Sequence, residues 1–198
     1  FDTLDLGFNI TYFDIEIEDP LMGSNVDFIQ QNFAGGKNTS KGIELATNWT
    51  DNDKLNIDFN YTYTKSYSGM DCDKPLKDAY GYKSCIDLNN GPIDSAMVRV
   101  PLHAFGSKID YEFNKSLNGS LLLTYKGRTR DYGTHDQDSY RDQILDEYFL
   151  IDLASSYKLS EGYKLNFSLK NVLDEDYENA NLYTGTSRTM NIGLNKKF

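Results

Sequence analysis

Side chains that could perform catalysis are few in this chain and form no recognisable constellation. The two histidines are His103 and His135, and neither stands in a nucleophile–histidine–acid set. A zinc site requires three or four ligands at compatible spacing, which the sequence does not offer. Glycine-rich phosphate-binding motifs are also absent. The sequence therefore predicts a protein that is not an enzyme and that holds no metal and no resident cofactor.

Both cysteines lie in one polar stretch, GMDCDKPLKDAYGYKSCIDLNNG, at Cys72 and Cys85. A disulfide between them would stiffen an external loop that contacts a ligand. Closing a loop of this size stabilises a fold by about 3 kcal/mol in the chain-entropy account. The alternatives are a pair of free thiols, or a disulfide that only protects the loop from proteases. Cysteines in such a polar stretch fit an oxidising compartment.

A second polar stretch, DYGTHDQDSYRDQILDE at 131–147, carries six acids and one arginine, for a net charge of −5. Clustered carboxylates suit a hard cation such as Ca²⁺, but their order is not that of an EF-hand loop. The alternative is a solvated acidic loop. Aromatic rings in the stretch could stack on a ligand or pack within the loop. The candidate ligand contacts are Tyr132, His135, Asp136, Asp138 and Tyr140.

These polar stretches connect segments in which apolar and polar residues alternate. In KLNIDFNYTYTKSY, Leu55, Ile57 and Phe59 alternate with Asn56 and Asp58. Because successive side chains of a strand point to opposite faces, this pattern predicts a strand with one apolar and one polar face. About eight such strands are expected, at 4–13, 42–49, 54–67, 103–113, 119–127, 149–159, 164–171 and 187–198.

The connections between these strands alternate in length. Short ones are 50–53, 114–118 and 160–163, and long ones are 19–36, 68–96, 131–147 and 175–186. Short turns at one end, long loops at the other and aromatic residues near the strand ends are typical of an antiparallel barrel in the bacterial outer membrane. A soluble antiparallel sandwich is the alternative, since its strands also alternate.

The chain ends SRTMNIGLNKKF, in which Met190, Ile192 and Leu194 share one face with the final Phe198. Outer-membrane barrels commonly end on an aromatic residue that the barrel-assembly machinery recognises. Three residues match that terminal pattern, namely Asn191, Gly193 and Phe198. Lys196 occupies a position where an apolar residue is usual, although a lysine can extend its ammonium group to an interface.

The composition excludes several classes of protein. The 198 residues include 20 basic and 30 acidic side chains, and a net charge of −10 argues against a nucleic-acid partner. The 15 tyrosines and 11 phenylalanines argue against disorder. No run approaches the 18 apolar residues of a transmembrane helix. The chain begins FDTLDLGFNI, so we expect a processed protein or a fragment.

Four stretches resemble TonB-dependent receptors. They are NTSKGIELATNW (38–49), RVPLHAFGSKIDYEF (99–113), LKNVLDEDYENA (169–180) and YTGTSRTMNIGLNKKF (183–198). The resemblance implies a barrel of about 22 strands around an N-terminal plug, of which residues 1–198 would supply about the last eight strands. The plug and its TonB box would then lie upstream.

The same resemblance implies an integral protein of the outer membrane that takes up a scarce nutrient complex of the cobalamin or iron–siderophore type. Its expected partners are the lipid bilayer, the TonB system, the barrel-assembly machinery and a small nutrient ligand. The alternative is a complete eight-stranded barrel with a structural or adhesive role. A continuous hydrogen-bond ladder between the strands of Ile10 and Ile192 would distinguish that alternative from a segment of a larger barrel.

Overall fold

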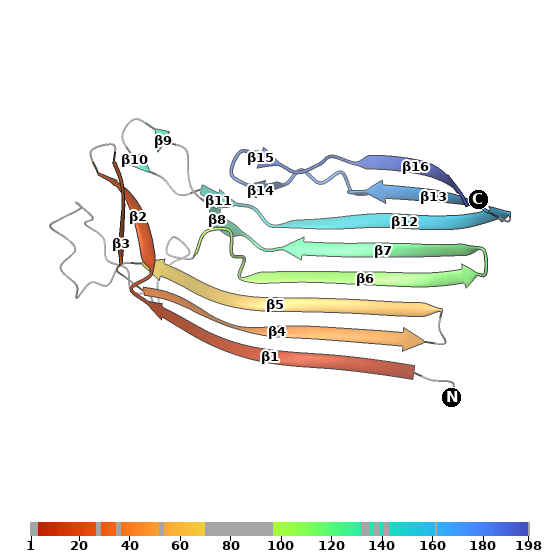
Figure 1. The fold of residues 1–198 in the computed structure, drawn as a ribbon, viewed down its shortest axis with the longest axis horizontal. Helices are drawn as coiled ribbons and strands as arrows, with labels where there is room; N and C mark the ends of the chain where they lie inside the picture. Colours follow the sequence, from red (N-terminus) through yellow and green to blue (C-terminus); the bar gives the residue numbers. More distant parts are fainter. Residues whose placement is uncertain are drawn as a thin grey trace.

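One antiparallel sheet of eight strands organises the protein (Figure 1). The computed structural model describes residues 4–26, 29–34, 37–51, 54–69, 97–131, 135–136, 139–140, 143–160 and 162–197. The sheet order is β1 (Leu4–Glu18), β4 (Lys37–Asp51), β5 (Leu55–Gly69), β6 (His103–Asn114), β7 (Leu117–Lys126), β12 (Tyr148–Ser160), β13 (Tyr163–Lys170) and β16 (Thr189–Lys196). The eight predicted strands and the all-β antiparallel class are confirmed.

The register of six neighbouring strands gathers large apolar residues on one face of the sheet and polar residues on the other, with a few exceptions. One row of cross-strand partners consists of Phe8, Thr47, Phe59, Ser107, Leu123 and Ile151. The adjacent row consists of Asn9, Ala46, Asn60, Gly106, Thr124 and Leu150. Because cross-strand partners share a face, we call the face of the first row the apolar face and that of the second the polar face.

Within the described part of the chain, no second layer of protein covers the apolar face. Phe8 is 71% exposed and Ile192 is 66% exposed. Among the described residues, Leu145 and Tyr148 are the only buried hydrophobic side chains. The other ladders of the described chain have two strands each, so the second large sheet that a soluble sandwich requires is not found there. This face is suited to hydrocarbon.

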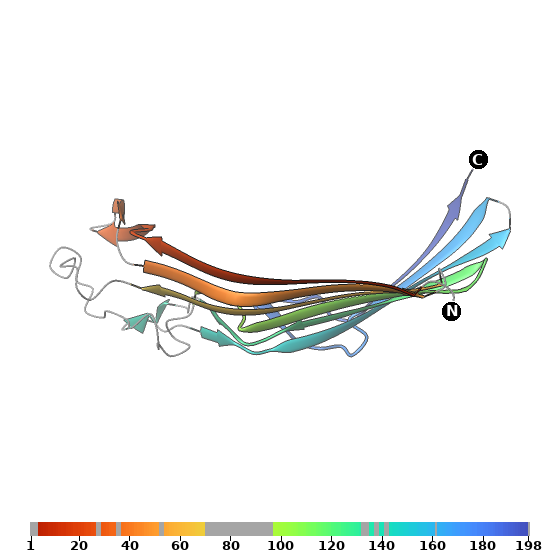
Figure 2. The same cartoon turned by 90° about the horizontal axis from the view of Figure 1, so that it is seen from below.

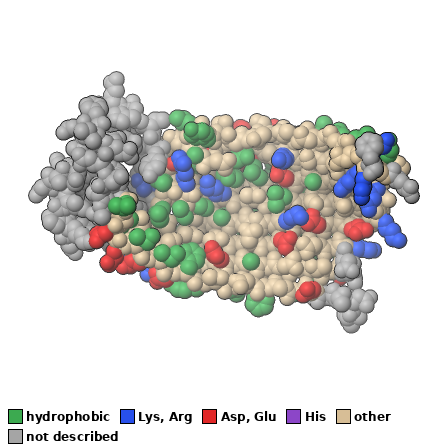
Figure 3. Space-filling view, in the orientation of Figure 1, with side chains coloured by type: hydrophobic (Ala, Val, Ile, Leu, Met, Phe, Trp, Pro, Cys, Tyr) green, Lys and Arg blue, Asp and Glu red, His purple; other side chains and the backbone are tan. Residues whose placement is uncertain are grey.

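Polar side chains connect the strands on the opposite face. Asn48 Nδ2 donates to Asp58 Oδ1 at 2.7 Å, and Ser120 Oγ donates to Asp110 Oδ1 at 2.5 Å. Asp58 is also the cross-strand partner of Lys108. Acidic and basic side chains are scattered over the sheet in the view of Figure 3. This face is suited to water or to a polar protein surface.

The two ends of the sheet differ, as the connection lengths predict. The turns β4–β5, β6–β7 and β12–β13 lie at one end, and the long connections lie at the other (Figure 1). Those long connections contain short ladders of their own: β2 (Leu21–Val26) with β3 (Ile29–Ala34), β8 (Thr129–Asp131) with β11 (Gln143–Leu145), β9 (His135–Asp136) with β10 (Ser139–Tyr140), and β14 (Glu178–Ala180) with β15 (Tyr183–Thr184). Within the described residues no helix has the length and apolar content needed to cross a bilayer.

The sheet is open. Ile10 of β1 pairs with Leu45, and Ile192 of β16 pairs with Phe167. In the part of the chain that the structure describes, no ladder joins β1 to β16, which are the two edges of the sheet. Figure 2 shows the sheet as a single curved, twisted layer. These strands therefore form a section of wall without a closed lumen.

Candidate functional site

A buried carboxylate organises the long-loop end of the sheet. Asp131, at the end of β8, is fully buried. Its Oδ1 accepts a hydrogen bond from Arg99 Nε at 2.9 Å, and its Oδ2 accepts one from the backbone N–H of Asn181 at 2.7 Å. These bonds join three segments that are far apart in the sequence. We call Arg99, Asp131 and Asn181 the Asp131 clasp.

Two residues in or next to this clasp have a left-handed backbone conformation. Arg99 has φ = 63° and Leu182 has φ = 67°. Residues other than glycine seldom occupy this left-handed region, because Cβ crowds the backbone there. The Arg99 N–H also donates to the carbonyl of Arg130 at 2.8 Å, which helps to hold the unfavourable conformation. The backbone is therefore fixed where it approaches Asp131.

Asn171 fixes the return of the chain toward β16. Its side chain is almost fully buried: Nδ2 donates to the carbonyls of Glu175 (2.9 Å) and Thr186 (3.1 Å), and Oδ1 accepts from the Glu175 N–H (2.9 Å). The Asn171 N–H donates to Asp152 Oδ1 at 2.8 Å. The polar residues of LKNVLDEDYENA thus hold the 171–186 connection against β12.

An aromatic contact joins the 171–186 connection to β12. The rings of Tyr148 and Tyr177 lie 4.6 Å apart between centroids. A Cβ placed on Gly185 would lie 2.1 Å from Tyr177 Cζ, so only glycine fits beneath that ring. Asn179 links this group to β7, because its Oδ1 accepts from Tyr148 Oη at 2.9 Å and its carbonyl accepts from Lys126 Nζ at 3.3 Å.

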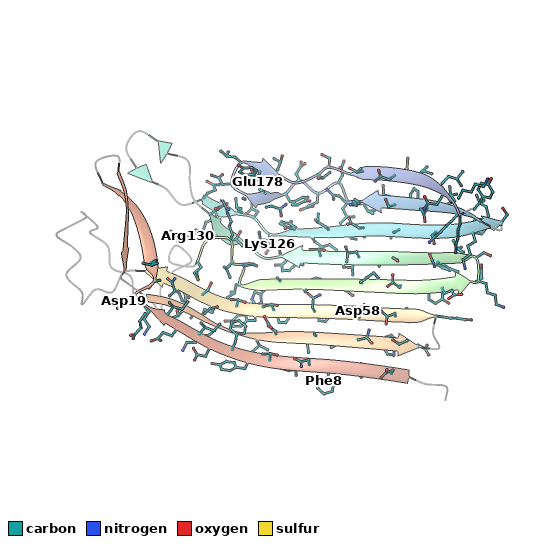
Figure 4. The ribbon with its side chains drawn as sticks, viewed as in Figure 1. Phe8, Asp19, Asp58, Lys126, Arg130 and Glu178 are labelled. Carbon is teal, nitrogen blue, oxygen red and sulfur yellow. The ribbon has the colours of Figure 1, made fainter. Side chains whose placement is uncertain are left out.

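Figure 4 shows how these polar groups gather at one end of the sheet. Lys126, Arg130 and Glu178 are labelled there close to one another, whereas Asp58 lies far along β5 toward the short turns. The clasp, the Asn171 turn and the Tyr148–Tyr177 contact all belong to this end. They hold the segments at the base of the long loops together, and binding residues of proteins are often carried by loops that such a scaffold positions.

The polar face is hollowed near the short turns. A cavity of about 480 Å³ is lined chiefly by small polar residues, among them Asn118, Ser120, Ser156, Asn166, Ser168 and Asn191. Ser156 Oγ donates to Asn118 Oδ1 at 2.6 Å. Within the described residues, no three His, Cys, Asp or Glu side chains are placed to hold a metal ion. Small polar side chains can contact another polar surface without a large desolvation cost.

The residues predicted for ligand contact are only partly described. Residues Cys72, Cys85, Tyr132, Asp138 and Phe198 lie outside the described residues. For His135, Asp136 and Tyr140 the structure gives backbone pairing alone, in the β9–β10 ladder. Asn191 and Gly193 lie on β16, opposite Ser168 and Asn166. The proposed ligand contacts and disulfide therefore remain predictions.

One member of the predicted acidic loop has a different environment. The sequence groups Asp131 with solvated carboxylates, whereas the structure buries it in the clasp. Its hydrogen bonds to Arg99 and Asn181 make it a structural group. Sequence analysis did not assign a role to Arg99 or Asn171, although each lies in a stretch that resembles the receptor family. The sequence signal for both residues was their position in those stretches. The sequence did not show their partners, which lie 32 residues from Arg99 and 15–19 residues from Asn171.

An antiparallel sheet with one face suited to hydrocarbon, one polar face, short turns at one end and long loops at the other is the wall of a transmembrane β-barrel. The family model described as "TonB dependent receptor-like, beta-barrel" matches residues 1–172, and the chain belongs to this family. It is therefore part of an integral protein of the bacterial outer membrane. No curated protein sequence matches the chain.

Several solved structures share the fold. The ferric-catecholate import receptor Fiu of E. coli K12 superposes with a TM-score of 0.70 at 18% identity, over 98% of this chain and 25% of that one. The siderophore receptor PiuA of Acinetobacter baumannii gives 0.71 at 20% identity, over 98% and 26%. The pyoverdine receptor FpvA of Pseudomonas aeruginosa PAO1 gives 0.74 at 15% identity, over 98% and 27%. The chain thus spans about a quarter of the length of these receptors.

Proposed function

We propose that residues 1–198 are the C-terminal section of the barrel wall in a TonB-dependent receptor that imports a ferric siderophore. The observation that carries the proposal is the open two-faced sheet, whose edge strands β1 and β16 have no partner ladder on their outer sides within the described chain. A plug and further strands encoded upstream would complete the barrel. The family match over 1–172 supports this assignment.

The choice of nutrient rests on the similar structures. Their titles name a ferric-catecholate import receptor, a siderophore receptor and a pyoverdine receptor. We therefore place a ferric siderophore ahead of cobalamin as the ligand of the complete protein. The barrel section would contribute no chemistry to the ligand. It would provide a wall for the plug on its polar face and loops for ligand capture at its external end.

The long loop between β8 and β11 is the part of this chain that we propose contacts the ligand. Its candidate residues are Tyr132, His135, Asp136, Asp138 and Tyr140. The Asp131 clasp supports this choice, because it anchors the first residue of the loop to two other segments. A loop held at its base loses less conformational entropy when it binds.

Iron uptake tests the proposal. Cells lacking the complete gene should lose uptake of at least one ⁵⁵Fe-labelled siderophore, and cells lacking TonB should lose the same uptake. Restoring the gene with Tyr132→Ala and Tyr140→Ala together should leave the protein in the membrane and lower that uptake. Unchanged uptake of every siderophore, together with a loss of cobalamin-dependent growth, would reassign the ligand. If the uptake of both nutrients is unchanged, that result would contradict a role in uptake.

A further inference from the structure

The charged side chains of the polar face differ in sign between its two halves. Those on β1, β4, β5 and β6 are Asp5, Glu44, Asp58, Asp110 and Glu112, with Lys108 as the cation. Those on β7, β12, β13 and β16 are Lys126, Lys158, Lys164 and Lys170, with Asp152 as the acid. We call these two parts of the polar face the acidic half and the basic half. Figure 4 labels one member of each, Asp58 and Lys126.

Neighbouring side chains engage the central carboxylates of the acidic half. Asp58 accepts hydrogen bonds from Asn48 Nδ2 at 2.7 Å and from Asn56 Nδ2 at 3.1 Å. Lys108 Nζ lies 2.5 Å from Asp110 Oδ2. The central charges of this half are therefore stabilised by side chains of the wall itself.

Three lysines of the basic half lack such partners. Lys158, Lys164 and Lys170 are exposed, and in the part of the chain that the structure describes none of them forms an ion pair. The acid of this half, Asp152, accepts a hydrogen bond from the Asn171 N–H at 2.8 Å. Lys158 and Lys164 are cross-strand partners, and like charges directly opposite each other destabilise a sheet. An anion bound between them would relieve this repulsion.

The cavity of about 480 Å³ on the polar face lies between these lysines, and its lining contains no charged side chain. Lys158 follows the lining residue Ser156 by two positions, so Lys158 and its partner Lys164 adjoin the short-turn side of the cavity. Lys170 follows the lining residue Ser168 by two positions and adjoins the opposite side. Two positions along a strand correspond to about 7 Å. An uncharged hollow is thus flanked by cations at both ends.

The cations of the basic half also occur at successive levels along the strands. Lys126 is the last residue of β7, at the long-loop end, where its Nζ donates to the carbonyl of Asn179 at 3.3 Å. Lys170 is the last residue of β13, and Lys158 and Lys164 lie beside the β12–β13 turn. Charges of one sign along a confined surface raise the local concentration of counter-ions. The basic half therefore favours an anion from the long-loop end to the short-turn end.

We propose that an anionic ferric complex crosses the complete receptor along the basic half, in contact first with Lys170 and then with the Lys158–Lys164 pair. This inference rests on the proposed import of a ferric siderophore. Ferric catecholate complexes are anions, because the charge of three doubly ionised catechols exceeds that of Fe³⁺. The small uncharged side chains between the lysines leave room for such a complex and offer it hydrogen bonds. The acidic half repels the same complex, so the charge of the cargo determines which part of the wall it follows.

Separate measurements of capture and of transport test this route. The variant of the complete receptor is Lys158→Gln with Lys164→Gln, and the probe is a ⁵⁵Fe-labelled tris-catecholate siderophore. Binding to cells on ice should stay within about twofold of the wild type, whereas the maximal uptake rate in energised cells should fall about tenfold, since focused charge alters the encounter rate of a charged ligand by about 10–10³-fold. Lys158→Arg with Lys164→Arg keeps both charges and should keep the wild-type rate. An unchanged rate in the glutamine variant, or a loss of binding on ice equal to the loss of rate, would overturn the proposal.

A charge-matched variant locates the effect on the basic half. Lys65→Gln with Lys115→Gln removes the same charge elsewhere, because Lys65 lies on the apolar face of β5 and Lys115 lies in the β6–β7 turn. This variant should keep the wild-type uptake rate. Equal losses in the two double variants would indicate a non-specific charge effect and overturn the proposal. If Lys158→Gln with Lys164→Gln does not reach the membrane, Lys170→Gln alone should still lower the rate by several-fold.

Sensitivity to vancomycin distinguishes a route for cargo from a contact with the plug. If the lysine pair held acidic residues of the plug, Lys158→Gln with Lys164→Gln would loosen the plug and admit this large antibiotic in cells that lack TonB. We expect the sensitivity of those cells to equal that of cells with the wild-type receptor. A clear increase would assign the lysines to the plug contact and overturn the proposal.

Uptake by the wild-type receptor separates this proposal from the proposed function. If the wild type takes up the ferric tris-catecholate and the glutamine variant does so at the same rate, the function stands and the route along the basic half fails. If the wild type takes up cobalamin and no ferric siderophore, the proposed function fails, and the anionic cargo fails with it.

Discussion

Arg99 shows how one residue can determine the geometry of a loop end. Its side chain is about half exposed, yet its Nε reaches the fully buried carboxylate of Asp131. The residue also adopts φ = 63°, a conformation that its neighbours must stabilise. A salt bridge with one buried partner is asymmetric, because loss of the exposed cation weakens the stabilisation of a carboxylate that stays buried.

This asymmetry leads to a prediction about Arg99→Ala. We expect the free energy of unfolding in phosphatidylcholine vesicles to fall by about 3 kcal/mol, because Asp131 would remain buried and lose its hydrogen-bonded guanidinium. The matched control is Arg128→Ala, whose guanidinium lies 3.9 Å from an exposed carboxylate and should contribute less than about 1 kcal/mol. Urea titration of the full-length receptor measures both, and equal costs would contradict the structural role of the clasp.

Gly185 supports a second prediction at the same scale. Gly185→Ala should destabilise the 171–186 connection, because the new Cβ would overlap the Tyr177 ring. Overpacking of this kind typically costs about 1–3 kcal/mol. Gly7→Ala is the matched control, since nothing lies within 4 Å of its Cβ position. Hydrogen exchange should show faster opening near Tyr177 in the first variant alone, and Tyr177→Ala should reduce the effect of Gly185→Ala.

At the scale of the strand, consecutive residues of β5 and of its neighbours lie on opposite faces of the sheet. Phe59 and Leu123 lie in one row on the apolar face, separated by Ser107. Asn60 and Thr124 lie in the next row, on the polar face. Their side chains point to opposite sides of one sheet only a few ångströms thick. Moving one position along the strand therefore takes a side chain from the hydrocarbon side of the sheet to its polar side.

Arginine substitutions on β5 test that separation. Phe59→Arg should lower the free energy of unfolding from lipid vesicles by about 2–4 kcal/mol, the usual cost of a cation near the middle of the bilayer. Asn60→Arg introduces the same side chain one position later and should cost much less, because it faces the polar side. The comparison is made by folding the full-length receptor into vesicles under urea. Equal losses would argue against a membrane-facing apolar surface.

At the scale of the whole molecule, the two edge strands limit the stability of the sheet in a membrane. β1 and β16 each have one neighbour in the described sheet. Unsatisfied backbone groups in hydrocarbon cost several kcal/mol each, so an open edge is not stable within a bilayer. Strands supplied from elsewhere in the complete receptor would pair these edges and close the barrel.

Isolation of residues 1–198 tests this requirement. The segment alone should aggregate or remain sensitive to protease when it is refolded into vesicles, whereas the full-length receptor should become protected. Resistance to unfolding in SDS without heating is a convenient measure of barrel closure. A segment that folds alone into an SDS-resistant barrel, with cross-linking between cysteines placed at Ile10 and Ile192, would contradict the assignment as part of a larger wall.

The class of fold, the eight strands and the length pattern of their connections could all be predicted from the amino-acid sequence. It could do so because a strand encodes its two faces with a period of two residues, as in Leu55 to Phe59, and this signal is local. The membrane-facing surface followed from the same alternation. The stretches at 99–113 and 169–180 indicated the receptor family before any contact was known.

The contacts that hold the long-loop end together could not be predicted from the sequence and are visible only in the folded chain. In the sequence, Asp131 is one of six acids in a polar loop. It is nevertheless buried, because residues 32 positions before it and 50 positions after it donate hydrogen bonds to its two oxygens. Such contacts depend on sheet register and strand length, which bring distant residues together and leave no periodic signal in the sequence.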